Sequence, residues 1–356
     1  MSNFTNDFIM MISTRLFAFP IAIFGFTLSL VIFSSCDSGN QQETTAEATS
    51  AERSRYAQIF EPLPAEAEAP ADNPMTEEKV DLGHMLFFEN RLSRSGIISC
   101  NSCHVVGAAG VDHRALAMGD SGRVGPRNSP TVYNAAFLQS QFWDGRAATL
   151  EEQAVGPIQA HVEMDLTPDE AMSRLDESGY RAYFEKAFPD EEDPFTFDNL
   201  AKAIASFERT LITPGAPFDR FLEGEEDALN EVEKAGLDLF MQSGCMGCHN
   251  GPLLGGNSFM PFTHASDQGS EDTGLHALTG DEADMYVFRV APLRNVEFTY
   301  PYFHDGSAKT LEEAVSVMGS SQLNREFTEE EVGQIVAFLK SLSGEFPMVT
   351  HPRLPR

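Results

Sequence analysis

Apolar residues recur along the chain at the three- and four-residue spacing of helices. One stripe consists of Leu200, Ile204, Phe207 and Leu211, and a second of Val332, Ile335, Val336, Leu339 and Leu342. Asp198 is the expected N-cap of the first helix, and Thr328 with Glu331 forms a capping box for the second. A third helix is expected to begin at Asn230, with Glu233 three residues later. No run of alternating apolar and polar residues predicts strands, so the expected fold class is all-α.

The N-terminus has the pattern of an export signal. Leu16–Phe33 is almost entirely apolar, Arg15 precedes it, and small residues lead into Cys36. This pattern resembles a bacterial lipoprotein signal, with residues 1–35 removed and Cys36 lipidated. The alternative is an uncleaved membrane anchor, since the segment is just long enough to span a bilayer. Under both interpretations the remaining chain is exported from the cytoplasm. In the first, a lipid at Cys36 holds it on the periplasmic side of a membrane, and residues 36–75 form a flexible tether.

Composition and charge narrow the choice of partners. The hydrophobic share of 42% is sufficient for packed cores. The chain has 24 Lys and Arg against 54 Asp and Glu, a formal charge of −30. Such a surface repels phosphates, which argues against binding to nucleic acid. It suits a small substrate or a basic protein partner.

Four of the five cysteines lie in two copies of one motif. Cys100–His104 and Cys245–His249 both read Cys-x-x-Cys-His, the attachment signature of c-type haem. Two thiols at this spacing can bond one porphyrin while the adjacent histidine reaches the iron. A redox dithiol and half of a zinc site are the alternatives for a single copy. Two copies in an exported chain favour two covalent haems.

An internal repeat indicates two similar domains. Asp144–Glu152 matches Asp305–Glu313 at an offset of 161 residues, and Asn134 and Asn295 stand ten residues before each match. The expected haem domains are residues 76–225 and residues 226–356.

The two copies differ where an iron would find its sixth ligand. Met318 stands eight residues after Thr310, and the same offset from Thr149 gives Pro157, which cannot bind iron. Methionine as an axial ligand raises the potential of a haem. The repeat therefore predicts one closed, electron-transferring haem and one open haem that can bind a small oxidant. Taken alone, Met318 would be assigned to the core.

Longer segments carry a family resemblance from about Asp81 to the C-terminus. They are Leu82–Phe88, Gly125–Thr131, Gln141–Arg146, Gly156–Gln159, Val162–Met164, Phe288–Val296, Pro301–Gly306 and Val317–Gly319, together with the two haem motifs. With these segments the chain resembles the bacterial di-haem cytochrome c peroxidases and the wider family that includes tryptophan-modifying di-haem enzymes.

The resemblance implies a set of ligands. His104 would bind the iron of the peroxidatic haem, and His249 with Met318 would bind the iron of the high-potential haem. The attaching thiols would be Cys100, Cys103, Cys245 and Cys248. A Ca²⁺ between the domains would be held by the Asn128 side chain and by the backbone carbonyls of Thr299 and Pro301, all hard oxygen donors.

The resemblance also implies the catalytic residues. Glu163 would be the acid–base group at the open iron, Gln153 would lie beside it, and Trp143 would lie between the haems. Without the family pattern, we would expect Glu163 to be a solvated acid, Gln153 a helix-surface amide and Trp143 a core aromatic.

One position departs from the family pattern. The family's peroxidases have a histidine in the loop after the first haem motif, which closes that iron until the enzyme is reduced. Asp120 occupies the equivalent position here. The first iron is therefore expected to be open without reductive activation, unless His113 or His161 replaces the missing ligand.

The function implied is reduction of H₂O₂ to water with electrons from a small cytochrome c or a cupredoxin; a homodimer is compatible with the family. A di-haem oxidase acting on a protein or an organic substrate is the first alternative, although that branch has Tyr at the position of Met318. A non-catalytic electron-transfer cytochrome is the second, and the open first iron argues against it.

Overall fold

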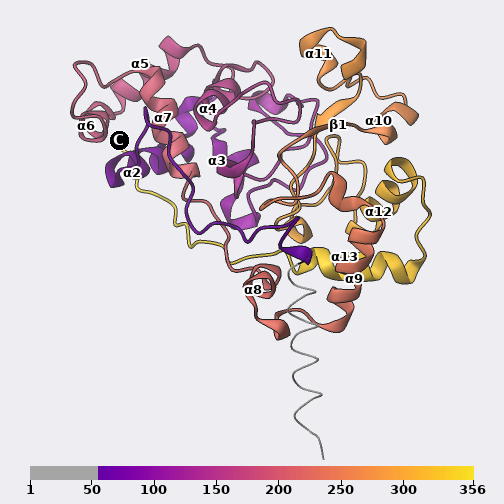
Figure 1. Cartoon of the computed structure of the whole chain (residues 1–356). Coiled ribbons are helices and arrows are strands. Elements are labelled where there is room, and N and C mark those ends of the chain that lie inside the picture. The colour runs from indigo at the N-terminus through magenta and orange to yellow at the C-terminus, as the bar shows by residue number, and fades with distance from the viewer. Residues whose placement is uncertain (1–54) are drawn as a thin grey trace, which may run out of the picture. The chain divides into compact units, whose positions relative to one another are not determined.

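A computed structural model describes residues 55–356, which all belong to one compact unit. Its regular structure is mostly helical (Figure 1). The helices of the first half are α2 (Glu77–Phe87), α3 (Cys100–Cys103), α4 (Leu150–Gln159), α5 (Pro168–Glu177), α6 (Arg181–Ala187), α7 (Phe197–Glu208) and α8 (Pro217–Glu223). Those of the second half are α9 (Glu231–Gln242), α10 (Thr263–Asp267), α11 (His276–Thr279), α12 (Leu311–Val317), a π-helix (Met318–Gln322) and α13 (Glu329–Lys340).

The expectation of an all-helical chain was wrong at one place. β1 (Phe259–Pro261) and β2 (Val287–Arg289) pair antiparallel as a two-stranded sheet. Strands of three residues are too short to give a visible alternation, so the sequence pattern did not predict them.

The helix starts were predicted with one error. The capping boxes of α9 at Asn230 and of α13 at Thr328 are both confirmed. The prediction for α7 was wrong by two residues, since Thr196 and not Asp198 caps it. The Thr196 hydroxyl accepts from the Asn199 N–H at 3.2 Å, which leaves Asp198 in the first turn.

A repeated pair of helices forms the frame of each half. α2 packs on α7, and α9 packs on α13. A Cβ on Gly83 would lie 1.8 Å from the Ala203 carbonyl oxygen, and one on Gly236 would lie 1.9 Å from that of Gln334. Only glycine permits such close backbone contact between helices. The internal repeat in the sequence therefore corresponds to a repeat in helix packing.

The loops between these helices repeat as well. Asn134 and Asn295 have left-handed backbones, with φ of 63° and 58°. Each donates from its side-chain amide to the Thr213 hydroxyl at 2.8 Å. Equivalent isolated β-bridges follow the two asparagines, namely Gln141 with Ala147 and Tyr302 with Ala308. Thr213 is thus the point where the two copies of the loop meet.

Each half has its own hydrophobic core. The first contains Leu82, Leu86, Phe87, Ile158, Tyr180 and Phe184, and the second contains Phe60, Phe218, Leu237, Val315, Phe338 and Leu342. Burying one such side chain contributes roughly 1.5–3 kcal/mol relative to exposure. The predicted domain limits at residues 225 and 226 stay predictions, although Phe218 and Phe221 of α8 already pack in the second core.

The expected tether is packed in its last part, which corrects that expectation. Tyr56, Phe60 and Leu63 are only 2%, 1% and 5% exposed. The Tyr56 hydroxyl donates to Asp238 at 2.8 Å, and the Leu63 N–H donates to Asp219 at 3.1 Å. The segment is rich in Glu, Pro and Ala, but its few large apolar residues are sufficient to dock it on the second core.

In the part of the chain that the structure covers, residues 55–356, no helix has the length and apolarity needed to cross a bilayer. The apolar segment Leu16–Phe33, the predicted lipidation site Cys36 and the first part of the expected tether lie outside the described residues.

Candidate functional site

The first haem motif forms a short capped helix. Within α3, the Ser102 hydroxyl accepts from the Ser99 N–H at 2.9 Å. The ring of His104 follows, with Nδ1 2.9 Å from the Pro130 carbonyl oxygen. That contact fixes the ring and leaves Nε2 as the nitrogen that is available to an iron. Burial lowers the pKa of His104, so the imidazole is held neutral, the form that binds a metal.

The second motif repeats this arrangement on a 3-10 turn over Cys245–Gly247. Nδ1 of His249 lies 3.0 Å from the Leu254 carbonyl oxygen, so Nε2 is again the nitrogen that is available to an iron. Burial also lowers the pKa of His249. Both histidines are therefore neutral and oriented by a backbone carbonyl.

The motif cysteines have the chemistry of attachment sites. None of the four is in a disulfide, and burial raises the pKa of the Cys103 and Cys245 thiols to about 11. A redox dithiol requires a lowered thiol pKa, so this alternative is disfavoured. The zinc alternative also finds no support, because residues 55–356 contain no cluster of three or more His, Cys, Asp or Glu side chains suited to a metal.

One cavity of about 690 Å³ connects the two motifs. Its lining includes every predicted site residue of the described chain, namely Cys100, Cys103, His104, Asn128, Trp143, Gln153, Glu163, Cys245, Cys248, His249, Thr299, Pro301 and Met318. Residues up to 218 positions apart in the sequence, Cys100 and Met318, thus share one internal surface.

Two buried arginines of the second half leave donor atoms unused at the cavity wall. Nη1 of Arg289 and Nη1 of Arg294 are unpaired, and these side chains are only 3% and 2% exposed. Burial lowers the pKa of Arg289 to about 10. Arg294 already pairs through Nη2 with the buried Asp219 carboxylate at 2.6 Å. Arg289 forms no ion pair within residues 55–356, and a buried cation with an unused donor suits an anion such as a haem propionate. Sequence reasoning did not single out either arginine, since the segment Phe288–Val296 carried only a family resemblance.

Glu163 lies in the loop after α4, and its side chain lines the cavity. Burial raises the pKa of its carboxyl, and the Arg146 guanidinium opposes the shift. Gln153 reaches the same cavity from α4. The first half of the cavity therefore offers a carboxyl group suited to proton transfer and an amide on the same wall.

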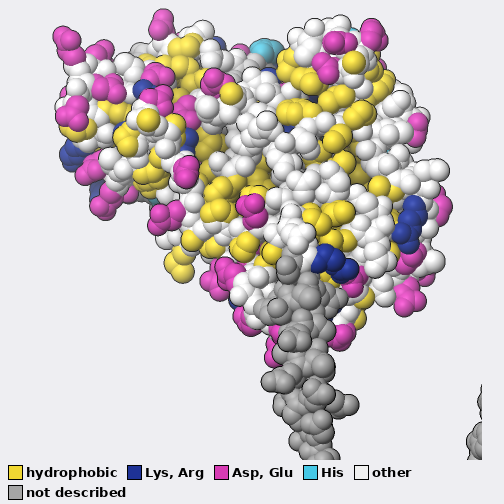
Figure 2. Space-filling model, viewed as in Figure 1, with side chains coloured by type: hydrophobic (Ala, Val, Ile, Leu, Met, Phe, Trp, Pro, Cys, Tyr) yellow, Lys and Arg dark blue, Asp and Glu magenta, His cyan; other side chains and the backbone are white. Residues whose placement is uncertain are grey.

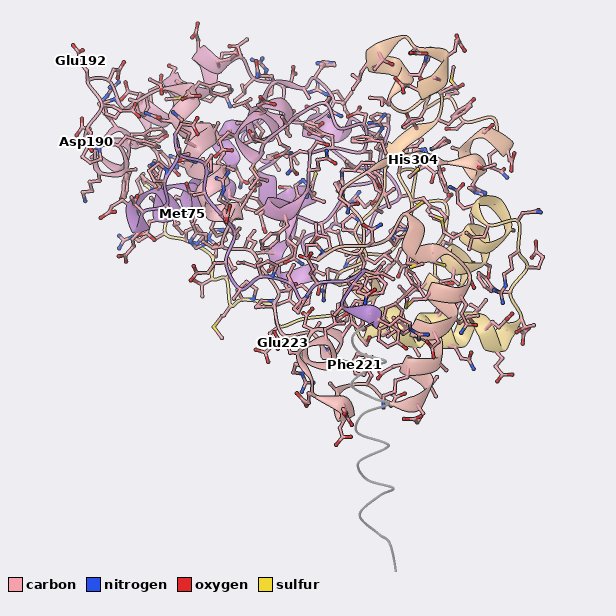
Figure 3. The ribbon with its side chains drawn as sticks, viewed as in Figure 1. Met75, Asp190, Glu192, Phe221, Glu223 and His304 are labelled. Carbon is pink, nitrogen blue, oxygen red and sulfur yellow. The ribbon has the colours of Figure 1, made fainter. Side chains whose placement is uncertain are left out.

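Trp143 connects the two halves. Its indole Nε1–H donates to the Asn128 carbonyl at 3.0 Å, and its own carbonyl accepts from the Arg289 N–H at 2.8 Å. Its ring meets that of His304 edge-on, with centroids 6.4 Å apart. Figure 3 labels His304, which is 2% exposed and whose Nε2 has no partner. Trp143 and Met318 both pack against the apolar cluster of Phe262, Ala265 and Phe288.

Met318 begins the π-helix that follows α12. π-Helical turns are rare and often mark functional sites. Gln322, at the other end of the turn, is anchored by its amide to the Pro261 carbonyl at 3.0 Å and by its oxygen to the Thr263 N–H at 2.8 Å. Pro157, the equivalent of Met318 in the repeat, lies inside α4 and also lines the cavity.

The predicted Ca²⁺ ligands Asn128, Thr299 and Pro301 all line the cavity. The Asn128 amide Nδ2 donates to the Arg114 carbonyl at 2.7 Å, which directs Oδ1 elsewhere. Their neighbour Tyr300 uses its carbonyl to accept from His113 at 2.9 Å. The donor set is compatible with Ca²⁺, and its role as a site stays a prediction.

The loop histidines are engaged away from the cavity, and neither lines it. The His113 ring stacks on Tyr300, with centroids 4.2 Å apart. The side chain of His161 is 73% exposed and lies 3.1 Å from Asp165. Asp120 is fully buried and makes hydrogen bonds of its own.

Comparisons with known proteins find relatives over most of this chain. Residues 77–227 match the family model described as di-haem cytochrome c peroxidase. The cytochrome c551 peroxidase of Pseudomonas aeruginosa is 48% identical over 305 residues, covering 83% of this chain and 88% of that protein. The methylamine utilization protein MauG of Methylophilus methylotrophus is 35% identical over 81% of this chain and 89% of its own.

A solved structure agrees as well. The crystal structure of a MauG-like protein associated with microbial copper homeostasis superimposes with a TM-score of 0.73 at 30% identity. It covers 79% of this chain and 93% of that one.

Proposed function

Since this chain belongs to the di-haem cytochrome c peroxidase family, an oxidoreductase family acting on peroxide with two c-type haems, we propose that it reduces H₂O₂ to water with electrons from a small donor protein. The observation that carries the proposal is the single cavity that holds Glu163, Met318 and both motif histidines. Membership of a peroxidase family sets aside the purely electron-transferring alternative.

The chain's own residues would hold both cofactors. When bound, the haems supply the iron centres that exchange electrons with peroxide. His104 would coordinate the first iron, and His249 with Met318 would coordinate the second. Arg289 and Arg294 would hold propionates through their unpaired Nη1 donors. The attaching thiols are Cys100, Cys103, Cys245 and Cys248.

Glu163 moves the proton. Reduction of H₂O₂ breaks the O–O bond, takes up two electrons and two protons, and releases two water molecules. The Glu163 carboxylate accepts a proton from the peroxide oxygen nearer the iron, called the inner oxygen. It returns this proton to the other, outer oxygen, which then leaves as water. The raised pKa of Glu163 suits both steps. The Gln153 amide orients peroxide by a hydrogen bond, and Trp143 lies on the electron path between the halves.

The first iron is open without prior reduction. Pro157 cannot bind iron, and Asp120 stands in place of the family's loop histidine. The two candidate substitutes are engaged elsewhere, His113 with Tyr300 and His161 with Asp165. Peroxide can then enter the fully oxidised enzyme.

The charge of −30 favours a basic electron donor such as a small cytochrome c. A cupredoxin is an equally compatible class of donor protein. Acidic side chains are spread over the face in Figure 2, where Lys and Arg are sparse. We place the enzyme on the periplasmic side of a bacterial membrane, attached by lipid at Cys36. A Ca²⁺ at Asn128, Thr299 and Pro301 would join the halves.

The test is steady-state consumption of H₂O₂ by the haem-loaded protein, with and without reduction beforehand. We expect turnover without a lag in both cases and a high-spin ferric signal in the electron paramagnetic resonance spectrum of the oxidised protein. A purely low-spin spectrum with a lag that reduction abolishes would contradict the open first iron. His113→Ala restoring a high-spin signal would then identify the replacement ligand.

Oxidation of a protein or organic substrate is the second candidate, favoured by the 35% identity to a methylamine utilization protein. Met318 at the second iron argues against it. Turnover with a reduced cytochrome c separates the two candidates.

A further inference from the structure

Asp120 is a buried carboxylate that the proposed reaction does not use. It is 0% exposed, in the loop that spans residues 117–125. Oδ2 accepts from the Ser95 N–H at 2.6 Å, and Oδ1 accepts from the Ser121 hydroxyl at 2.6 Å. The Arg123 guanidinium lies 3.9 Å away. These contacts tie the loop to the segment just before the first haem motif.

The same loop rests on the backbone of Glu163. The Asp120 N–H donates to the Glu163 carbonyl at 2.6 Å. A Cβ on Gly119 would lie 2.1 Å from the Val162 carbonyl oxygen and 2.6 Å from the Glu163 Cα. The two loops therefore pack backbone to backbone, and a shift of Asp120 would be passed directly to Glu163.

Further contacts brace the residues that follow Glu163. Arg123 pairs with Asp165 at 2.9 Å, and the Arg94 N–H donates to the Met164 carbonyl at 2.8 Å. Ser95 is the next residue after Arg94. The Arg94–Met164 hydrogen bond and the Ser95–Asp120 hydrogen bond therefore start from one short segment. Asp120 is the link that joins this segment to the carbonyl of Glu163 itself.

We infer that Asp120 is a positioning residue whose carboxylate clips the 117–125 loop to Ser95 and so holds the Glu163 carboxyl in its place in the cavity. The inference rests on the proposed function, in which Glu163 carries the proton. A carboxylate accepts from Ser95 and Ser121 at once, whereas a neutral imidazole has one acceptor nitrogen. These hydrogen bonds, together with Arg123, lower the pKa of Asp120 to about 2 against the effect of burial, so the clip persists over the working pH range.

The first test compares Asp120→Ala with Asp120→Asn. Without the clip, we expect Asp120→Ala to lower kcat for H₂O₂ by about 10- to 100-fold, the scale of a small misplacement of a catalytic group. KM should change by less than about threefold, because peroxide contacts Glu163 and not Asp120. The Asn side chain can still accept from Ser95 through its amide oxygen, so Asp120→Asn should stay within about threefold of the wild type. Equal loss in both variants would overturn the inference.

The second test asks whether Asp120 acts through Glu163. In a Glu163→Gln background, Asp120→Ala should lower kcat by less than about twofold, because the group that it positions no longer transfers a proton. A full additional loss would overturn the inference. If Glu163→Gln alone left turnover unchanged, the proposed role of Glu163 would fail instead, so the two failures are distinguishable.

Two further measurements separate positioning from loss of folding. Glu89→Ala removes another buried carboxylate of the same half, which accepts from the Arg91 N–H at 2.9 Å and lies outside the cavity lining. It should lower thermal stability without changing kcat per haem. Deuterium exchange should rise in residues 160–165 for Asp120→Ala but not for Glu89→Ala. If Asp120→Ala fails to load haem, Ser121→Ala removes one of the two hydrogen bonds and should give a smaller loss of kcat with the same local rise in exchange. Unchanged exchange would overturn the inference.

Discussion

The two halves of the molecule share one helical scaffold but differ at the C-terminal ends of the equivalent helices α4 and α12. Thr149 caps α4 and Thr310 caps α12, and each side chain accepts from the N–H three residues later. Eight residues after the caps, α4 continues as an α-helix through Pro157, whereas α12 passes into a π-helix at Met318. The comparison teaches that the repeat preserves the frame and differs at the position where Met318 is predicted to bind the second iron.

The halves also differ in the charge of their cavity walls. The first half presents three carboxyl groups, Asp144, Glu163 and Glu208, together with Arg127 and Arg146, and burial raises the pKa of Glu163 and Glu208. The second half presents the buried guanidinium groups of Arg289 and Arg294. Carboxyl groups with raised pKa are suited to proton transfer, and buried guanidinium groups are suited to holding anions. We therefore expect proton transfer in the first half and anion binding in the second.

The largest expected effect is loss of one haem without loss of the other. Cys245→Ala combined with Cys248→Ala removes both attachment points of the second haem, and the intact-mass spectrum should then show one covalent haem instead of two. The reciprocal control is Cys100→Ala with Cys103→Ala, which should also leave one haem. A wild-type protein with a single haem, or with bound zinc, would end the interpretation of two equivalent attachment sites.

Glu163→Gln tests the assignment of proton transfer to the first half. The substitution keeps the size of the side chain but removes the titratable group, so turnover should fall by about 10²- to 10⁴-fold while peroxide still binds. Stopped-flow binding and steady-state rates measure the two effects separately. Glu152→Gln, at an exposed acid of α4, is the matched control. Turnover of Glu163→Gln within about twofold of the wild type would refute the assignment.

Met318→His tests the assignment of electron storage to the second half. Histidine donates more strongly to iron than a thioether, so the second haem should stay low-spin while its reduction potential falls. Turnover with a high-potential donor should drop as a consequence. A redox titration with optical detection measures the potential, and Met348→His, at a side chain 94% exposed, is the control. An unchanged titration curve would mean that Met318 is not a ligand.

The parts of this comparison that local sequence determines were predictable. The two Cys-x-x-Cys-His motifs, the capping boxes at Asn230 and Thr328, and the repeat at Asn134 and Asn295 are all short-range patterns, and the structure contains each of these helices and loops. A capping box is set by residues three positions apart, so it needs no knowledge of the tertiary fold.

The parts that depend on contacts between distant segments were not predictable. Nothing local to Arg289 or Glu208 indicates that its polar atom is buried without a partner, because the covering residues come from other elements. Likewise, Asp120 was recognised only as a departure from a family pattern. Its hydrogen bond to Ser95, 25 positions away, and its contact with the Glu163 loop became visible only in the fold.

The prediction with the smallest expected effect on turnover concerns Glu208, at the end of α7. It is 5% exposed, Oε2 has no partner, and burial raises its pKa to about 8, with Glu151 adding to the shift and Arg209 opposing it. A carboxyl group with a raised pKa in the folded state stabilises the fold only while it is protonated. Its contribution is complete below about pH 4.5, the ordinary value, and is lost as the pH rises through about 8.

Glu208→Gln is neutral at every pH, so it should remove this loss. Relative to the wild type, the variant's melting temperature should rise progressively from pH 5 to pH 9. Relative to the wild type, the variant's free energy of unfolding should rise by about 1.4 kcal/mol for each pH unit over a limited pH range. This range begins at the ordinary pKa of Glu208 and ends at the pKa of Glu208 in the folded, haem-loaded protein. Calorimetry of the loaded protein across this range measures it, with Glu185→Gln at an exposed acid of α6 as the control. A difference in melting temperature that is the same at pH 5 and pH 9 would mean that Glu208 is ionised throughout. Within residues 55–356, the part of the cavity wall that the second half contributes contains no Asp or Glu side chain. A difference in melting temperature that depends on pH would therefore show that the two halves also differ in the titratable groups of their cavity walls.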